Sequence, residues 1–593
     1  MSGRTQLRWL AVSSQLFLTC AVLFWPGVTR AANQARLVFG QERFTRSTGV
    51  PDTQSRQFTV PAYVTAPFTL DIINGNPESG NGAIPDAVSS GSLSVDGHEV
   101  VAEREFSKTT PRITKEISLT AGAHTLDVRL DSAPDSYIRV SIAGVIALGD
   151  LTQPRSGHTA TLLADNNVLI AGGMSNGTAQ RTAERFDVAT LKATALSAPL
   201  AAARSDHAAA LLPQRDALLT GGSDAAGPIP SAELYRAASA TFSAIGASLP
   251  IARSGQSATL LLDGSILILG GHGVAGSAIN QSESFDPNHD PLTGALFNPI
   301  NGAFKLLPHA LSVARSNHTA TLLPSGQILV AGGRNDAGLL SSAELFDPAS
   351  GRSTPLPSSL NIGRAEHSAT LRSDGSVVIA GGVGGEGLLD SIEVYAPQSQ
   401  SFAPLATKLI VARRNHTATL LSIGEILIAG GEGTSGTLAH AELIGPAEAD
   451  TSAPQVMATA PANGSVGADL NGIVAVRFSE PVNVSSLTAA NVRLSVAGQP
   501  IAAVVSAGES GLYAFIVPNA LLAAGTTHTV SLENVRDLGG SALPSTSSSF
   551  TTVSAPSIAS FSPAHGPKGT SVRVVGSAFD PTGPQRNIVS LGS

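Results

Sequence analysis

The chain has 593 residues, of which 42% are hydrophobic and only 13% are charged, and its formal net charge is -8. This length is too great for one ordinary hydrophobic core, so we expect several domains. The sparse and slightly acidic charge excludes a protein that holds nucleic acid through clustered Lys and Arg. The 60 glycines and 36 prolines, together with many Val, Thr and Ser residues, predict an all-β fold rich in turns.

Residues 1–32 have the layout of a secretory signal peptide. Arg4 and Arg8 form a basic start, and a largely apolar stretch follows over residues 10–24. An uncleaved membrane anchor remains the alternative, although this stretch is short for a bilayer span. Cleavage would remove Cys20, the single cysteine, so we expect an exported mature chain without disulfides or thiol chemistry.

Residues 33–148 predict a first β-sandwich domain. Alternating apolar and polar residues recur at 68–75 and 124–130, which indicates sheets with one buried face. The Asp96-Gly97 pair predicts a hairpin turn. The stretch resembles the small exported β-sandwich that precedes Rhs-type and Ig-like repeats in large bacterial surface proteins. That resemblance implies no activity.

The region from residue 149 to 447 repeats one segment six times. Each copy opens on an arginine, usually as Arg-x-x-His, reaches a Gly-Gly pair 17 residues later, and then a Glu-containing block close to Ala-Glu-Leu-Phe-Asp-Pro. Four of the five steps between openings are 49 residues long and one is 62. A fixed period near fifty predicts stacked units, none of which buries its apolar face alone. The opening arginines are Arg155, Arg204, Arg253, Arg315, Arg364 and Arg413.

Three further positions recur with the arginine. The histidines are His158, His207, His318, His367 and His416, with Gln256 in the third copy. The glycine pairs are Gly172-Gly173, Gly221-Gly222, Gly270-Gly271, Gly332-Gly333, Gly381-Gly382 and Gly430-Gly431. The glutamates are Glu184, Glu233, Glu283, Glu344, Glu393 and Glu442. A ring symmetry spreads equivalent side chains apart, whereas a metal needs converging ligands, so we predict structural roles for all of them, with each glutamate a candidate partner for an arginine.

Each copy contains four predicted strands, except the last, in which no clear fourth strand follows residue 443. In the fourth copy they lie at 318–323, 327–331 and 342–347, with a weaker strand at 353–356. Four strands in a unit of this length are typical of a propeller blade.

The Gly-Gly pair, the Glu-Leu-Phe-Asp-Pro block and the Arg-x-x-His opening resemble kelch repeats of the galactose-oxidase-like propeller family. The resemblance implies a six-bladed propeller, although the Trp usual in the fourth strand of a kelch repeat is missing. We expect residues 144–148 to close the ring by pairing with the last blade. The 62-residue step places an insertion at residues 288–303, and loops carry function more often than frameworks do. The insertion, Gln256 and the unequal loops after each Gly-Gly are therefore the places where we look for function.

Two further segments follow the repeats. Over residues 451–554, the Phe478-Ser479-Glu480-Pro481 motif and the turn at residues 537–540 resemble the bacterial Ig-like domain of surface-layer and adhesin proteins. Residues 555–593 resemble the start of an IPT/TIG Ig-like domain. Because a segment of about 40 residues rarely builds its own core, we expect this unit to be incomplete or poorly ordered. The predicted whole is an all-β chain with a six-bladed kelch-like propeller flanked by an N-terminal and a C-terminal β-sandwich.

The sequence offers no catalytic centre. The galactose-oxidase-like family includes copper radical oxidases, which need a Cys joined to a Tyr, a second Tyr and His ligands. Loss of Cys20 removes that chemistry, and Tyr235 and Tyr395 stand where other repeats carry Phe. Nucleophile elbows, zinc-binding His-Glu-x-x-His motifs, phosphate-binding loops and dinucleotide fingerprints are absent from the sequence. We therefore expect no catalytic residue, no cofactor and no metal.

The pattern favours an exported, monomeric, non-catalytic binding or scaffold protein of the bacterial surface or exterior. Its propeller loops would present a binding face to an extracellular protein or glycan. The alternative is a hydrolase or lyase that acts on extracellular polysaccharide through loop carboxylates. Both tryptophans, Trp9 and Trp25, belong to the predicted signal peptide, and sugars commonly stack on aromatic rings. Their loss counts against either sugar-binding role.

Overall fold

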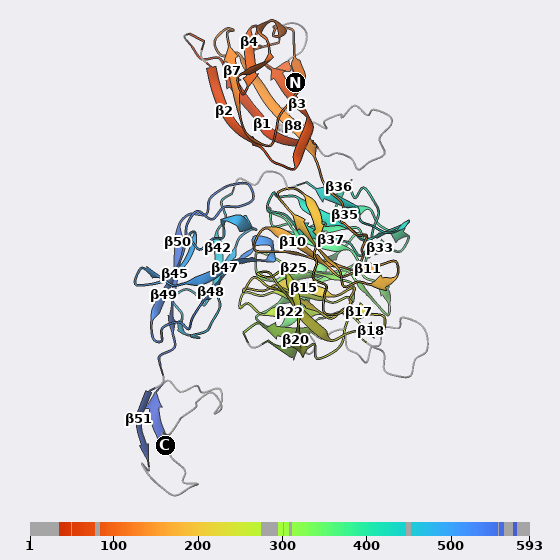
Figure 1. The fold of residues 1–593 in the computed structure, drawn as a ribbon, viewed down its shortest axis with the longest axis vertical. Coiled ribbons are helices and arrows are strands. Elements are labelled where there is room, and N and C mark those ends of the chain that lie inside the picture. Colours follow the sequence, from red (N-terminus) through yellow and green to blue (C-terminus); the bar gives the residue numbers. More distant parts are fainter. Residues whose placement is uncertain are drawn as a thin grey trace, which may run out of the picture.

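The computed structural model describes residues 35–48, 50–51, 53–77, 84–273, 294–300, 302–307, 311–445, 452–555, 557–562 and 573–577. Within these residues the chain is almost wholly β-structure, as predicted, with a few one-turn 3-10 helices (Figure 1). The predicted signal peptide at residues 1–32 lies outside the described part. No helix among the described residues is long and apolar enough to cross a bilayer.

The N-terminal region is a β-sandwich of two four-stranded sheets. Its elements are β1 (Ala35–Thr45), β2 (Thr53–Val60), β3 (Val64–Asn74), β4 (Gly91–Val95), β5 (His98–Val101), η2 (Glu103–Glu105), β6 (Arg112–Ile117), β7 (Gly122–Leu130) and β8 (Tyr137–Ile146). One sheet has the order β1-β8-β3-β6 and the other β2-β7-β4-β5. Alternate residues such as Leu70, Leu126 and Val128 fill the core between them. Asp96 and Gly97 both have positive φ and join β4 to β5 as the predicted hairpin.

The prediction that residues 144–148 pair with the last repeat is wrong. β8 continues to Ile146 and pairs with β1 and β3, so its last residues belong to the sandwich. Ile142, Gly144 and Ile146 of β8 are buried, and the strand stays paired with both neighbours across the register shifts near residue 143. The chain meets the last repeat a few residues later, where Leu151 N donates to Ala439 O (2.9 Å) and Arg155 N to Leu438 O (3.1 Å).

The repeat region consists of six antiparallel sheets, one for each copy. The strands of the first three are β9 (Thr159–Leu162), β10 (Asn167–Ala171), β11 (Met174–Ser175), β12 (Thr178–Ala179), β13 (Ala183–Asp187), β14 (Lys192–Ala195), β15 (Ala208–Leu211), β16 (Ala217–Thr220), β17 (Ser223–Asp224), β18 (Gly227–Pro228), β19 (Ser231–Arg236), β20 (Thr241–Ser248), β21 (Ser257–Leu260), β22 (Ile266–Leu269), β23 (Gly294–Asn298) and β24 (Ala303–Leu307). Those of the last three are β25 (Thr319–Leu322), β26 (Ile328–Ala331), β27 (Arg334–Asn335), β28 (Gly338–Leu339), β29 (Ser342–Asp347), β30 (Arg352–Ser359), β31 (Ser368–Leu371), β32 (Val377–Ala380), β33 (Val383–Gly384), β34 (Gly387–Leu388), β35 (Ser391–Ala396), β36 (Ser401–Lys408), β37 (Thr417–Leu420), β38 (Ile426–Ala429), β39 (Glu432–Gly433), β40 (Gly436–Thr437) and β41 (Ala441–Ile444).

The sheets share one plan. The main strands of a repeat pair in chain order, as in β25-β26-β29-β30, and the last sheet has three described strands, β37-β38-β41. Every residue of the second strand β26 is buried, which accounts for its continuous apolar sequence. The first strands contact their neighbours in the cyclic order β9, β15, β21, β25, β31, β37, and β37 contacts β9. A short hairpin such as β27–β28, which the sequence pattern did not predict, links the second strand to the third.

The third repeat differs from the prediction. Its third strand is β23, in which Phe297 pairs with Ile266, and not the Glu283 block. Glu283 lies outside the described residues, and Ala295 has the register position that Glu344 holds in the fourth repeat. The extra residues therefore precede the third strand. Of the insertion predicted at 288–303, residues 288–293 lie outside the described part, residues 294–298 form β23 and residue 303 begins β24.

The aromatic residue of the third strand is part of the framework. Phe297, Tyr235 and Tyr395 are buried at matching register positions. Each packs on an aromatic ring of the fourth strand, with centroids 4.9–5.1 Å apart. The two tyrosines thus stand where another repeat has Phe, as their positions in the sequence indicate.

The C-terminal region is a second β-sandwich. Its elements are β42 (Val456–Ala460), β43 (Val466–Ala468), β44 (Val474–Phe478), η3 (Val484–Ser486), β45 (Val492–Val496), β46 (Gln499–Pro500), β47 (Ala503–Gly508), η4 (Glu509–Gly511), β48 (Tyr513–Pro518), β49 (Thr527–Leu532) and β50 (Thr546–Thr552). The sheets have the orders β42-β44-β48-β47 and β43-β50-β49-β45-β46. Beyond them, β51 (Ser557–Ser562) pairs with β52 (Arg573–Ser577), and the other residues of the predicted TIG-like segment lie almost wholly outside the described part.

The C-terminal sandwich packs against one side of the repeats. It contacts the turns between first and second strands: Ser506 Oγ donates to Pro213 O (2.7 Å), and Leu260 N donates to Glu509 Oε1 (2.6 Å). The N-terminal sandwich also reaches such a turn, through an ion pair between Arg36 and Glu425. In Figure 1 the hairpin strands β11, β17, β18 and β33 lie on the side of the repeats away from β47 and β48. The hairpin side of the repeats is thus the one that the C-terminal sandwich leaves uncovered.

Candidate functional site

The repeated arginine and glutamate form a buried ion pair in five repeats. Both side chains are almost fully buried, and the nitrogen–oxygen distances are 2.6–2.9 Å. The pairs are Arg155–Glu184, Arg204–Glu233, Arg315–Glu344, Arg364–Glu393 and Arg413–Glu442. Arg253 donates to Gly270 O (2.8 Å), and its predicted partner Glu283 lies outside the described residues.

Backbone groups complete each of these ion pairs. Arg315 Nη1 donates to Gly332 O (2.6 Å), and Glu344 Oε2 accepts from Ser312 N (2.7 Å). Burial lowers the pKa of Arg315, an effect that Glu344 opposes by stabilising its charge. Removal of one partner from such a pair leaves a buried charge without compensation. The pair therefore fixes the end of the second strand and the start of the third to the opening of the repeat.

The glycine pairs lie where adjacent repeats meet. Gly332 and Gly333 have φ values of 62° and 91°, which favour glycine. A Cβ at Gly332 would lie 2.7 Å from both Arg364 O and the His367 ring of the next repeat. Gly333 N donates to the same carbonyl, Arg364 O (2.8 Å). Both the conformation and the close approach therefore require glycine.

The repeated histidines join neighbouring first strands. Their Nε2 atoms lie 2.9–3.1 Å from a hydroxyl of the preceding repeat. These contacts are His158–Thr417, His207–Thr159, His318–Ser257, His367–Thr319 and His416–Ser368. Burial, aided by the nearby repeat arginine, lowers every histidine pKa, to about 3 for His318 and His416. The imidazoles are thus neutral at pH 7, and the Nδ1 atoms have no hydrogen-bond partner among the described residues.

Gln256 is explained by the repeat before it. At the position where the other repeats offer a Thr or Ser hydroxyl, the second repeat has Ala208. Gln256 Nε2 instead donates to Thr220 O (2.8 Å) at the end of β16. The missing hydroxyl and the missing histidine therefore compensate for each other. The one exception in the histidine series is therefore explained by hydrogen bonding between repeats, and no ligand is needed to explain it.

The residues just before the histidine position form a second ring. In each of these six residues, the backbone N–H donates to the carbonyl of the equivalent residue in the preceding repeat. The circle closes where Gly157 N of the first repeat donates to Asn415 O of the last. The six hydrogen bonds are 2.7–2.9 Å long, and all six residues have φ between 50° and 65°. In cyclic order the ring consists of Gly157, Asp206, Gly255, Asn317, Glu366 and Asn415.

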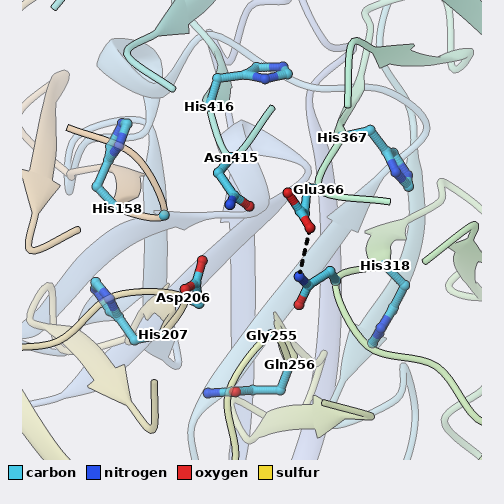
Figure 2. Close-up of a pocket in the computed structure, with 12 residues that line it drawn as sticks. His158, Asp206, His207, Gly255, Gln256, His318, Glu366, His367, Asn415 and His416 are labelled. Atoms are coloured by element: carbon cyan, nitrogen blue, oxygen red, sulfur yellow. Dashed lines mark hydrogen bonds between the residues drawn. The ribbon is translucent and has the colours of Figure 1, made fainter. Parts of the chain in front are cut away.

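This ring lines a pocket with a volume of about 120 Å³, together with the six residues that follow its members. Figure 2 shows Asp206, Glu366 and Asn415 reaching toward the middle, with the histidines around the edge. Asp206 lies between the two glycine positions of the ring. Three positions away, and thus opposite in the cyclic order, Glu366 lies between two asparagines. A pocket within a repeated framework is thereby made asymmetric.

Glu366 is held by an ionic network. Its carboxylate pairs with Arg334 and with Arg414 (3.2 Å), and Arg414 also pairs with Glu432 (2.9 Å). Asn317 Nδ2 lies 3.5 Å from Glu366 Oε1, the contact dashed in Figure 2. Two neighbouring carboxylates raise the pKa of Arg414, although its partial burial opposes them. Within this network both Glu366 oxygens accept hydrogen bonds from arginines of the neighbouring repeats.

The recurrence in the sequence singles out the histidines but not the ring beside them. The signal was present, because this position varies among Gly, Asp, Asn and Glu between an arginine and a histidine that scarcely vary. Gly, Asn and Asp are the residues that most readily adopt a positive φ, so the position predicts a left-handed turn. Glu366 is the unusual member, with a φ of 59°. Such an outlier is a reason to look for function at its position.

Comparison with known proteins identifies one part of the chain. A family model described as a bacterial Ig-like domain matches residues 450–552, which confirms the Ig-like domain predicted over 451–554. Among solved structures, one described as the structure of YjhT aligns with 51% of this chain and 97% of that chain, at 16% identity and a TM-score of 0.42. No curated protein matches the chain.

Proposed function

We propose that the six sheets form a six-bladed kelch-like propeller and that the chain is an exported, non-catalytic binding or scaffold protein of the bacterial surface or exterior. The cyclic contacts of the first strands and the closed circle of backbone hydrogen bonds support the propeller. The Ig-like domain, of a class typical of extracellular proteins, supports export. Its partner would be an extracellular protein or glycan.

One observation carries this proposal: among the described residues, the repeated Arg, Glu and His side chains contact the framework, whereas one set of equivalent residues varies and lines a pocket. That set is the ring of Gly157, Asp206, Gly255, Asn317, Glu366 and Asn415. A unique site needs asymmetry, and this ring provides it. Both flanking sandwiches contact the turns between first and second strands. The side with the hairpins, such as β17–β18 and β33–β34, is therefore the proposed binding face.

The test compares charge reversals on the two faces. A face variant carries Asp336→Arg and Glu386→Arg, which lie exposed at hairpin tips. A matched control carries Asp165→Arg and Asp374→Arg, exposed in turns between first and second strands. The full mature chain and both variants are assayed on glycan arrays and by crosslinking to extracellular proteins. We expect the face variant to lose the partner and the control to keep it.

Two results would contradict the proposal. Equal loss of the partner in both variants would mean that the hairpin face is not the binding face. Release of reducing ends from extracellular polysaccharides by the mature chain would favour the hydrolase or lyase that the sequence left open.

A further inference from the structure

We propose that the outer face of the sheet β1-β8-β3-β6 binds an acidic polysaccharide, whose carboxylate groups are held by Arg43 and Arg139. This sheet belongs to the N-terminal sandwich, where β1, β3 and β8 are seen in Figure 1. The inference therefore goes beyond the proposed function, because it places a second binding face away from the hairpins of the repeats.

Arg43 and Arg139 lie directly opposite each other on two paired strands. Arg43 of β1 is in register with Arg139 of β8. The next residues along the strands, Phe44 and Ile138, are buried in the core, so the two arginines point to the outer face of the sheet. Like charges directly opposite each other on neighbouring strands destabilise a sheet. An anion bound between the two guanidiniums would offset this repulsion.

One aromatic ring lies beside both guanidiniums. The Cζ atom of Arg43 is 3.8 Å from the centroid of the Tyr137 ring, and the Cζ atom of Arg139 is 5.5 Å from it. These cation–π contacts stabilise the two charges and keep them close to each other. A guanidinium that lies over a ring keeps its N–H donors in its own plane, and these donors match the two oxygens of a carboxylate. Tyr137 thus holds two donor groups side by side without neutralising them.

The other arginines on the strands of this sandwich each have an acidic partner. Arg112 lies in the same cross-strand row as Arg139, because Ile73 of β3 pairs with both, and it forms an ion pair with Asp71. Within the described part of the chain, neither Arg43 nor Arg139 forms an ion pair. The matched pairs are Arg36–Glu425, Arg56–Glu42, Arg112–Asp71 and Arg129–Asp131.

Two aspartates flank the arginine pair at one end of β8. Tyr137 N donates to Asp86 O (3.0 Å), and Asp135 N donates to Arg46 O (2.9 Å). Both aspartates are exposed, and neither forms an ion pair with a described residue. They reduce the positive potential at this end of the strand without neutralising either arginine of the pair. Removal of one of these charges is therefore expected to strengthen the binding of an anion.

The surroundings of the pair favour a hydrophilic partner. Thr45 and Ser141 flank the pair along the strands, and Ile73 is its apolar neighbour on β3. Protein interfaces usually centre on apolar and aromatic side chains that become buried. Here the Tyr137 ring is only 6% exposed, because it is already covered. A polysaccharide with repeated carboxylates needs no apolar centre and no stacking ring when arginines bind its charges. This face therefore fits an acidic polysaccharide better than an acidic segment of a protein.

The test measures binding of a short oligogalacturonate to the full mature chain by calorimetry at low salt. Its methyl ester, which has the same sugars without the charges, is the neutral control. We expect the charged form to bind, and Arg43→Gln/Arg139→Gln to weaken it at least about tenfold, as loss of charge-assisted hydrogen bonds would. Arg104→Gln/Arg129→Gln removes two exposed arginines elsewhere on the sandwich and is expected to leave binding unchanged. Asp86→Asn is expected to tighten binding several-fold.

Thermal unfolding shows whether the double variant is folded, and the single variant Arg43→Gln, at an exposed position, gives the same readout if the double variant is unstable. Equal binding of the methyl ester, or equal affinities of wild type and these variants, would overturn the inference.

A glutamate peptide of equal charge decides the kind of partner. Weaker binding of the peptide than of oligogalacturonate supports a polysaccharide. Equal or tighter binding of the peptide overturns that assignment and indicates an acidic protein segment. The charge reversals at the hairpin tips leave Arg43 and Arg139 in place. Loss of the partner in that variant with intact oligogalacturonate binding therefore separates the two proposals.

Discussion

Two neighbouring positions of each repeat, one residue apart, behave in opposite ways. The histidine position has the same residue in five of the six repeats, and these side chains form contacts between first strands. The position before it holds four residue types, although all six residues share one backbone conformation and one hydrogen-bond pattern. Uniform side chains thus mark what each interface between repeats needs. Varied side chains on a uniform backbone mark where the repeats are free to differ.

The comparison also explains why the conserved-looking positions of the repeat are poor candidates for a unique site. Arg315, Glu344, Gly332 and His367 all have their main contacts inside the framework. The six hydrogen bonds that close the ring use only the backbone, so they form with any side chain at these positions, and the side-chain ion pairs to neighbouring repeats described for Glu366 are particular to that member. Substitutions in the two classes should therefore differ in kind: one class changes stability, and the other changes binding.

The largest expected effect is acid destabilisation of the repeats through the buried histidines that join the first strands. Burial depresses the pKa of His318 and His416 to about 3, below the unfolded value of 6.5. Between these values the unfolded state binds more protons, so stability is complete above about pH 6.5 and is lost as pH falls toward 3. Each histidine contributes about 1.4 kcal/mol per pH unit in this window. Hydrogen exchange of amides in β26 and β38 should therefore accelerate steeply between pH 6.5 and 5.

A matched variant tests this cause. Replacement of His318 by Gln should reduce the proton uptake on unfolding by one, because glutamine does not titrate. An unchanged pH dependence in His318→Gln would show that other groups, such as the carboxylates, dominate acid unfolding.

Breaking a buried ion pair is expected to be the most damaging single substitution. Glu344→Gln leaves the Arg315 charge buried without its counter-charge, at a cost of about 3–5 kcal/mol in the free energy of unfolding. The exposed pair of Lys408 and Asp390 provides the control, and Asp390→Asn should cost less than about 1 kcal/mol. Denaturant unfolding of both variants measures the difference. Similar losses in the two variants would contradict a special role for the repeated pair.

The glycine pair is expected to be the next most sensitive position. Gly332→Ala places a methyl group against Arg364 O and the His367 ring at a φ of 62°, and the conformation alone costs about 1–3 kcal/mol. A Cβ at Gly246 in β20 would meet no atom within 4 Å, so Gly246→Ala is the control and should be close to neutral. Thermal unfolding distinguishes the two. An unchanged unfolding temperature in Gly332→Ala would mean that adjacent repeats can move apart at this point without loss of stability.

Much of this framework could be predicted from the sequence, because a repeat shows its constraints six times. Four main strands in the first five copies follow from the period and the strand pattern. The structural role predicted for the shared residues rests on the same recurrence. The third strand of the third repeat could not be located in this way. Both the Glu283-Ser284-Phe285 block and the segment Leu296-Phe297-Asn298 fit the motif, and only pairing with β22 selects the second.

The ring of varied residues was missed for the opposite reason. A pattern search gives weight to what recurs, and Asp206 and Glu366 are single occurrences. Their opposition across a pocket depends on the order in which first strands contact one another, a relation between residues 160 positions apart in the chain. The sequence does constrain their backbone, through the preference of Gly, Asn and Asp for positive φ. The turn was therefore accessible to prediction, whereas the pocket required the assembled ring.

The contact between the second and third repeats uses a different pair of residues, and this pair can be introduced between the first and second repeats. Ala208 and Gln256 replace the Thr–His contact that Thr159 and His207 make one repeat earlier. Thr159→Ala alone leaves His207 Nε2 without its partner and should cost about 1–3 kcal/mol. In the double variant Thr159→Ala/His207→Gln the amide can donate to the carbonyl of Ala171, the position equivalent to Thr220.

We therefore expect the double variant to be more stable than the sum of its single variants predicts, by about 1 kcal/mol, as a double-mutant cycle in denaturant would measure. Additive losses would mean that the glutamine cannot reach that carbonyl in the first repeat. Gln256 would then depend on something particular to its own place in the ring, beside Gly255 and the pocket. Coupling of the expected sign would assign Gln256 to the framework and leave the varied ring as the asymmetric part of the site.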